Sequence, residues 1–178
     1  GAIKTIGVNP NNGTCPGAFS EVGNINNQSA AIGRFGNYIF YLHYGNGGQS
    51  AGDGKVNIRS MHINGTDHDN EGNYDLNGSS SSDLGFVRLA IDKAGKGWIL
   101  AKKMSSNQMY LARFTANGTN GDVSSFTVVS SNITTSDNTN SVFENGDICF
   151  DGNGQMYALA NNTNATTKIY TMNPNGST

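Results

Sequence analysis

The chain has 178 residues, of which 35% are hydrophobic and 13% are charged, and its formal net charge is −2. Its 11 Lys and Arg residues are scattered, which argues against nucleic acid as a partner because a phosphate backbone needs clustered positive charge. No apolar stretch approaches the roughly 18 residues that a membrane-spanning helix requires.

An abundance of turn-forming residues sets the expected fold class. Gly alone accounts for 24 residues, and with Asn, Ser and Thr it makes up nearly half of the chain. These residues are unfavourable in helices, because Gly loses backbone entropy and Ser and Asn side chains compete for backbone hydrogen bonds. Tight turns need the same residues. The composition therefore predicts an all-β chain with many short strands.

The first predicted elements are two apolar strands joined as a hairpin. They span 37–44 and 55–63, with a glycine-rich tip at 45–54 between them. The tip lacks the Gly-Lys-Ser/Thr sequence of a phosphate-binding loop, and no helix is predicted after it. We therefore expect the tip to serve only as a connection.

Two histidines lie on opposite arms of this hairpin. With the tip centred near residues 49 and 50, paired residue numbers sum to about 99, so that His43 faces Val56 and His62 faces Asn37. The two histidines are then not cross-strand neighbours. This arrangement argues against a zinc site or a general base built from them.

The best candidate metal site follows at 67–75. Its acidic residues alternate with polar ones, and a Gly at position 72 lets the chain turn; they are Asp67, Asp69, Glu71 and Asp75. Spaced carboxylates suit a hard cation, so the segment is a candidate calcium site. Position 12 of such a loop would be Gly78 instead of a bidentate Glu, and no helix flanks the segment. The alternative is a solvated acidic surface loop.

An internal repeat connects the middle of the chain with its end. Residues 89–101 and 148–160 each contain an apolar strand that ends in Asp, then a Gly-containing turn and a second strand. Asp92 aligns with Asp151. An Asp followed closely by Gly caps a tight turn, so we expect a structural role for both carboxylates.

The repeat continues into a third strand and, in its middle copy, a fourth. Residues 109–114 match 168–172, and an extra strand is predicted at 123–129. Four antiparallel strands per repeat is the number in one β-propeller blade. We therefore expect a single β-repeat domain over 1–178 with approximate repeats at 30–80, 84–135 and 143–178.

This pattern resembles the blade motif of β-propellers of the NHL and SMP-30-like kind. The resemblance is good over 148–174, fair over 86–119 and marginal over 35–66. It implies a propeller-like fold and no particular activity. Three repeats are too few to close a propeller, which typically needs about 4–8 blades. The chain is therefore expected to be part of a longer protein, to complete a ring with further copies, or to form a different β-stack.

Aromatic residues and cysteines give weaker signals. Tyr44 and Tyr74 lie next to loops and are the better candidates for stacking on a sugar ring, whereas Trp98 occupies a repeat position that favours packing. Cys15 and Cys149 would close a long loop if they form a disulfide outside the cell. The alternative is that Cys149 is a small buried side chain.

The sequence predicts a non-catalytic binding or assembly module of an extracellular or cell-surface protein. Low charge with abundant Asn, Thr, Ser and Gly is typical of exported bacterial surface proteins, and adhesion or filament-type assembly fits an unclosed number of repeats. The expected partners are further repeats of the same protein, a glycan or a surface protein.

Two alternatives to this prediction remain open. The first is a glycan-binding, lectin-like propeller. The second is a metal-dependent propeller hydrolase or lactonase, an alternative that the SMP-30-like resemblance implies. Such an enzyme needs carboxylates at the inner ends of several blades. Sequences of the type His-Glu-x-x-His, Gly-x-Ser-x-Gly and Cys-x-x-Cys do not occur.

Overall fold

The computed structural model describes residues 2–5, 20–24, 29–43, 55–76, 84–103, 105–162, 164 and 166–172. Most of these residues are in β-strands, and the described part of the chain includes one short 3-10 helix, η1 (Asn140–Val142). The prediction of an all-β chain is therefore confirmed. Within the described ranges there is no helix with the length and apolarity to span a bilayer.

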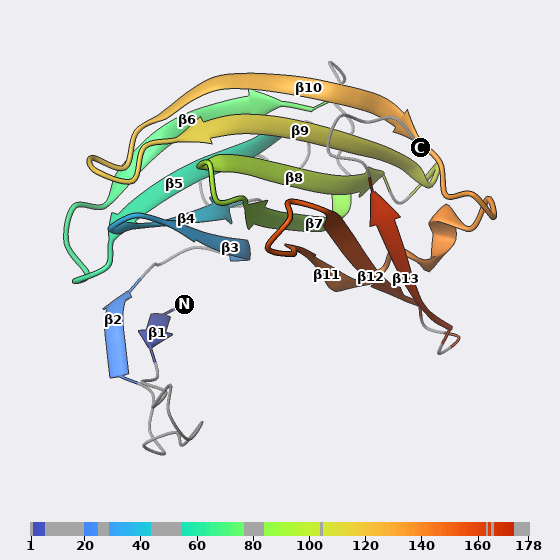
Figure 1. Ribbon diagram of the computed structural model, residues 1–178, viewed down its shortest axis with the longest axis horizontal. Helices are drawn as coiled ribbons and strands as arrows, with labels where there is room; N and C mark the ends of the chain where they lie inside the picture. The colour runs from blue at the N-terminus through green and yellow to red at the C-terminus, as the bar shows by residue number, and fades with distance from the viewer. Residues whose placement is uncertain are drawn as a thin grey trace.

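The strands form antiparallel sheets from consecutive stretches of chain (Figure 1). The first sheet contains β3 (Ser29–Phe35), β4 (Tyr38–His43), β5 (Lys55–His62) and β6 (Asp69–Asp75). The second sheet contains β7 (Leu84–Ile91), β8 (Lys96–Lys103), β9 (Gln108–Ala116) and β10 (Val123–Ile133). The third sheet contains β11 (Asn145–Phe150), β12 (Met156–Asn161) and β13 (Thr167–Met172), and a separate pair consists of β1 (Ala2–Thr5) and β2 (Ser20–Asn24).

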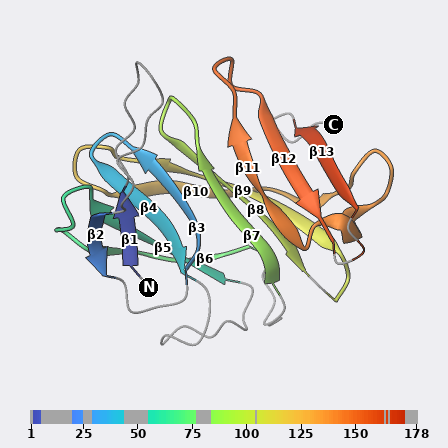
Figure 2. The same ribbon diagram turned by 90° about the horizontal axis from the view of Figure 1, so that it is seen from below.

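The three larger sheets follow one another through their first strands. β7 contacts β3 on one side and β11 on the other, and Figure 2 shows these three strands next to one another. In Figure 1 the last strands of the first two sheets, β6 and β10, lie at the top, away from β3, β7 and β11. Each sheet therefore presents a face to the next sheet in the chain.

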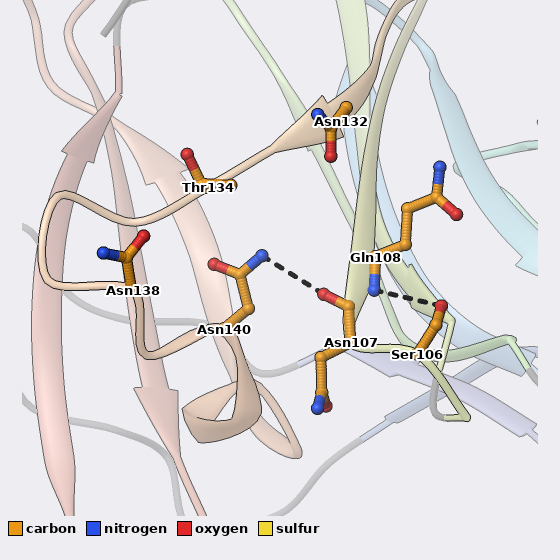
Figure 3. A pocket seen from close by; sticks show the side chains of 7 residues that line it. All are labelled: Ser106, Asn107, Gln108, Asn132, Thr134, Asn138 and Asn140. Atoms are coloured by element: carbon orange, nitrogen blue, oxygen red, sulfur yellow. Dashed lines mark hydrogen bonds between the residues drawn. The ribbon is translucent and has the colours of Figure 1, made fainter.

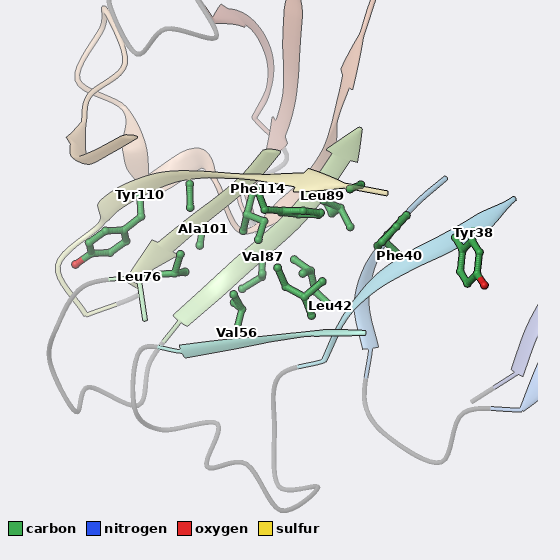
Figure 4. Close-up of a cluster of buried hydrophobic side chains, with 14 residues drawn as sticks. Tyr38, Phe40, Leu42, Val56, Leu76, Val87, Leu89, Ala101, Tyr110 and Phe114 are labelled. Atoms are coloured by element: carbon green, nitrogen blue, oxygen red, sulfur yellow. The ribbon is translucent and has the colours of Figure 1, made fainter. Parts of the chain in front are cut away.

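Two hydrophobic cores fill the spaces between successive sheets. One joins the first and second sheets, with Phe40 from β4 and Phe114 from β9 among its members (Figure 4). The other joins the second and third sheets. Alternate residues of β8 enter different cores: Ile99 packs in the first, and Leu100 packs in the second. The second sheet is thus buried on both faces, which explains why its strands are apolar at successive positions.

The repeated turns have the same hydrogen bonds in both copies. Asp92 Oδ1 accepts from the backbone N–H of Ala94 and of Lys96, each at 2.9 Å. Asp151 Oδ1 accepts from the backbone N–H of the equivalent residues, also at 2.9 Å. The predicted turn role of both carboxylates is confirmed.

The first hairpin differs in register from the prediction by one residue. His62 pairs with Tyr38 and His43 pairs with Asn57, so the two histidines are not cross-strand neighbours. The connection is longer than a tight turn, and its length alone did not fix the centre of the hairpin.

Candidate functional site

The acidic segment is mostly strand and not the loop that the sequence suggested. Asp69, Glu71 and Asp75 belong to β6, which pairs with β5, and Asp67 lies in the turn before it. Six residues of strand span about 20 Å, so Asp69 and Asp75 lie too far apart to share one cation. The structure spreads three of the four carboxylates along an edge strand and places Asp67 before it, and calcium binding there stays a prediction.

Asp67 is engaged by a tyrosine of the first sheet. The Tyr38 hydroxyl donates a hydrogen bond to Asp67 Oδ2, and the buried Tyr38 ring meets the His62 ring edge-on at 5.2 Å. The hydrogen bond to Asp67 raises the pKa of Tyr38 to about 12, with smaller contributions from burial and from the negative charges of Asp67, Asp69 and Asp122. The neutral phenol is therefore strongly preferred in the folded chain.

This preference predicts a loss of stability at high pH. Because the folded pKa of Tyr38 lies above the unfolded value of 10.0, its contribution is complete below about pH 10 and is lost as the pH rises towards about 12. We expect the free energy of unfolding, measured with urea, to fall less between pH 9.5 and 11.5 in Tyr38→Phe than in the original chain. Parallel curves for the two proteins would contradict the Tyr38–Asp67 hydrogen bond.

Glu71 connects the first and second sheets. Its Oε1 accepts from the Ser60 hydroxyl at 2.7 Å, and its Oε2 accepts from the Val123 backbone N–H at 3.1 Å. Val123 begins β10 of the second sheet. Both oxygens of this carboxylate thus have structural partners, which explains an acidic residue in the middle of a strand.

The predicted ligand-stacking tyrosine Tyr74 is half-buried and packs against the first core. Its ring is stacked on Phe126 at a centroid distance of 4.4 Å, and its hydroxyl donates to the Glu71 carbonyl oxygen at 2.8 Å. Burial raises the pKa of Tyr74, with a contribution from the charge of Glu71. The face of the Tyr74 ring that meets Phe126 is therefore covered. The other predicted tyrosine, Tyr44, lies outside the described residues.

The predicted disulfide also extends beyond the described chain. Cys15 lies outside the described residues, so the pairing with Cys149 stays a prediction. Cys149 itself is exposed in β11. The alternative of a small buried side chain is therefore wrong, because Cys149 alternates with the buried Ile148 and points to the opposite face of the third sheet.

That opposite face carries several large side chains, and we name it the third-sheet outer face. It consists of the residues of β11–β13 that point away from the second sheet: Asp147, Cys149, Tyr157, Leu159, Ile169 and Thr171. Leu159 and Ile169 are directly paired across β12 and β13, and they are 41% and 71% exposed. An exposed aliphatic pair at the centre of a sheet face is unusual for a surface that meets only water.

The second sheet has the same pair in a covered state. Leu100 and Leu111 are paired across β8 and β9, at the repeat positions of Leu159 and Ile169. Both leucines are fully buried in the core that joins the second and third sheets. The third sheet therefore presents outward the same kind of surface that the second sheet uses to bind its neighbour.

A second candidate site is a polar hollow beside the connection between the second and third sheets. It has a volume of about 380 Å³ and is lined by three short segments, Ser106–Gln108, Asn132 with Thr134, and Asn138 with Asn140 (Figure 3). All seven lining side chains are amides or hydroxyls. This hollow could not be found from the sequence, because separate Asn and Thr residues in connections resemble ordinary turn residues.

The described residues contain no group of three or more His, Cys, Asp or Glu side chains that is placed to hold a metal ion. The candidate surfaces are thus an apolar sheet face and an uncharged polar hollow. In comparisons with known proteins, no family model matches this chain and no curated protein matches it.

Proposed function

We propose that this chain is a non-catalytic assembly module of a secreted or cell-surface protein, and that two copies join head to tail into a propeller-like ring. The third-sheet outer face of each copy packs on the first sheet of the other. The observation that carries the proposal is the exposed Leu159–Ile169 pair, which matches the buried Leu100–Leu111 pair one repeat earlier.

The order of the sheets supports a head-to-tail contact. The second sheet uses one face to contact the first sheet and the other face to contact the third sheet. A second copy that continues this order places its first sheet against the third-sheet outer face. Burial of Ile169 and Leu159 there removes apolar surface from water, which favours association.

The first sheet has an apolar side that faces away from the second sheet. Ile39, Tyr41 and Met61 form a small buried cluster there. Ile32 pairs with Tyr41 across β3 and β4 and is 55% exposed. This side therefore offers an exposed aliphatic residue beside a packed cluster, which suits it as the receiving surface.

The number of sheets supports a ring of two copies. Each copy supplies three sheets of three or four strands, so two copies supply six, within the range of about 4–8 blades that closes a propeller. The contacts of β7 with both β3 and β11 support an arrangement in which the first strands gather around one axis. Closure also covers Ile32 and the Leu159–Ile169 pair, which are exposed in a single copy.

The experiment is light scattering coupled to size exclusion at about 50 µM, together with two variants. The original chain should have a mass of about 38 kDa, twice the 18.8 kDa of one copy. Ile169→Asp and Ile32→Asp should each raise the dimer dissociation constant at least about tenfold, because a carboxylate would be buried in the contact. Ser124→Asp adds the same charge to an exposed position of β10 and should leave the dimer unchanged.

Mixing the two variants tests the head-to-tail order. In a ring of two identical variants, each of the two contacts contains one introduced carboxylate. In a ring with one copy of each variant, one contact contains both carboxylates and the other contact is unsubstituted. The mixture should therefore contain more dimer than either variant alone. A mixture that stays as dissociated as its components overturns the order. A monomeric original chain, or an Ile32→Asp variant that dimerises normally, overturns the proposed contact itself.

A further inference from the structure

The polar hollow beside the second and third sheets contains several side chains that are available to a ligand. Asn132, Thr134 and Asn138 are exposed and line it, and within the described ranges their side chains make no hydrogen bond. Gln108 uses only its Nε2, which donates to the Ser131 carbonyl oxygen at 2.7 Å, so that its Oε1 remains open to the hollow. The hollow thus offers both donors and acceptors.

A rigid framework holds these groups in place. Asn140 Nδ2 donates to the carbonyl oxygens of Ile133 at 2.9 Å and of Asn107 at 3.1 Å, and its Oδ1 accepts from the Thr135 backbone N–H at 2.9 Å (Figure 3). Asn140 therefore ties the end of β10 to the turn between β8 and β9. The Asn138 backbone N–H donates to the Thr135 carbonyl oxygen at 2.9 Å. The backbone of a site held in this way loses little conformational entropy when the site binds a ligand.

We propose that this hollow binds a neutral saccharide, independently of whether the chain assembles into a ring. Each sugar hydroxyl both donates and accepts hydrogen bonds, and an amide side chain offers a donor and an acceptor side by side. Three amides and one hydroxyl with open groups, from Gln108, Asn132, Thr134 and Asn138, match that pattern. The volume of about 380 Å³ lies within the range of small-molecule sites.

The lining also argues against other ligand classes. No ionisable side chain lines the hollow, so a phosphate or a carboxylate ligand would lose hydration without gaining an ionic partner. Asp137, next to the lining residue Asn138, is engaged in a salt bridge with Lys168. The buried Lys102 donates from Nζ to Oδ1 of the lining residue Asn107 at 3.3 Å. No aromatic ring lines the hollow, and a nucleobase needs one as a stacking platform.

The test is a titration of the full chain, labelled with nitrogen-15, with five neutral saccharides at up to about 10 mM. The probes are methyl α-mannoside, lactose, cellobiose, maltotriose and diacetylchitobiose, and sodium glucuronate is the charged comparison. At least one neutral saccharide should shift the side-chain amide signals of Asn132, Asn138 and Gln108. Glucuronate should shift them less.

Variants locate the binding. Asn132→Ala and Asn138→Gly should each weaken binding at least about tenfold, and glycine at 138 keeps the left-handed backbone angle of 54° there without strain. Asn73→Ala, at an exposed position of β6, is the matched control and should bind normally. The proposal is overturned if none of the five saccharides shifts these signals, or if the hollow variants bind as well as the control.

Discussion

Gly146→Ala should destabilise the chain by about 3–4 kcal/mol, measured as the free energy of unfolding in urea. A Cβ atom at this position in β11 would lie 1.9 Å from the backbone oxygen of Leu159 in the neighbouring strand. The Gly146 φ angle of 127° is also one that L residues rarely adopt. Since the obstacle is backbone, the strain can be relieved only by moving β11 away from β12.

The same substitution six residues later is the control. A Cβ added to Gly152, in the turn between β11 and β12, meets no atom within 4 Å, so Gly152→Ala should change stability by less than about 0.5 kcal/mol. The Gly146 carbonyl oxygen also accepts from Arg88 Nε at 2.6 Å, a link between the second and third sheets. Equal stabilities of the two variants would contradict the pairing of β11 with β12 described above.

Gly97→Ala should cost about 2–4 kcal/mol, for a different reason. Gly97 in β8 lies directly opposite Phe114 in β9, and an added Cβ would come within 2.1 Å of the Phe114 ring. Phe114 is fully buried and packs near Phe40 at a centroid distance of 6.3 Å. A movement of the ring away from the Cβ would therefore disturb the core between the first and second sheets.

A double-mutant cycle separates this steric clash from a general loss of strand stability. Phe114→Leu alone should cost about 1–2 kcal/mol because the core loses contacts. In the presence of Phe114→Leu, Gly97→Ala should cost at least about 1 kcal/mol less than it does alone, since the ring that obstructs the Cβ is gone. Strictly additive costs would show that Phe114 does not lie on Gly97.

The parts of the fold that depend on local chemistry could be predicted from the sequence. The turns at Asp92 and Asp151 depend on side chains that bond to backbone within four residues, and such contacts are visible in a short window of sequence. The extra strand predicted at 123–129 is present within β10. These features follow from residue types and spacing alone.

The parts that depend on distant partners could not be predicted. The segment 69–75 has the composition of a loop, but it forms β6 because it pairs with β5 and because Glu71 accepts from Val123 on the second sheet. Tertiary contacts override weak strand propensity here, and charges suit an edge strand. The polar hollow depends on three separate segments, which tertiary contacts such as the Asn140–Asn107 hydrogen bond bring together.

The two faces of the second sheet have a consequence for how chains of this kind can lengthen. The second sheet packs against a neighbour on each face, and the repeated turns of the second and third sheets each close through their own Asp. Duplication of the stretch that encodes one sheet adds a receiving face and a received face together. In an open row of stacked sheets, only the outer faces of the first and last sheets are uncovered, whatever the number of sheets. Each added sheet also contributes a new buried core. Growth by duplication thus leaves the amount of uncovered sheet surface unchanged at every number of repeats.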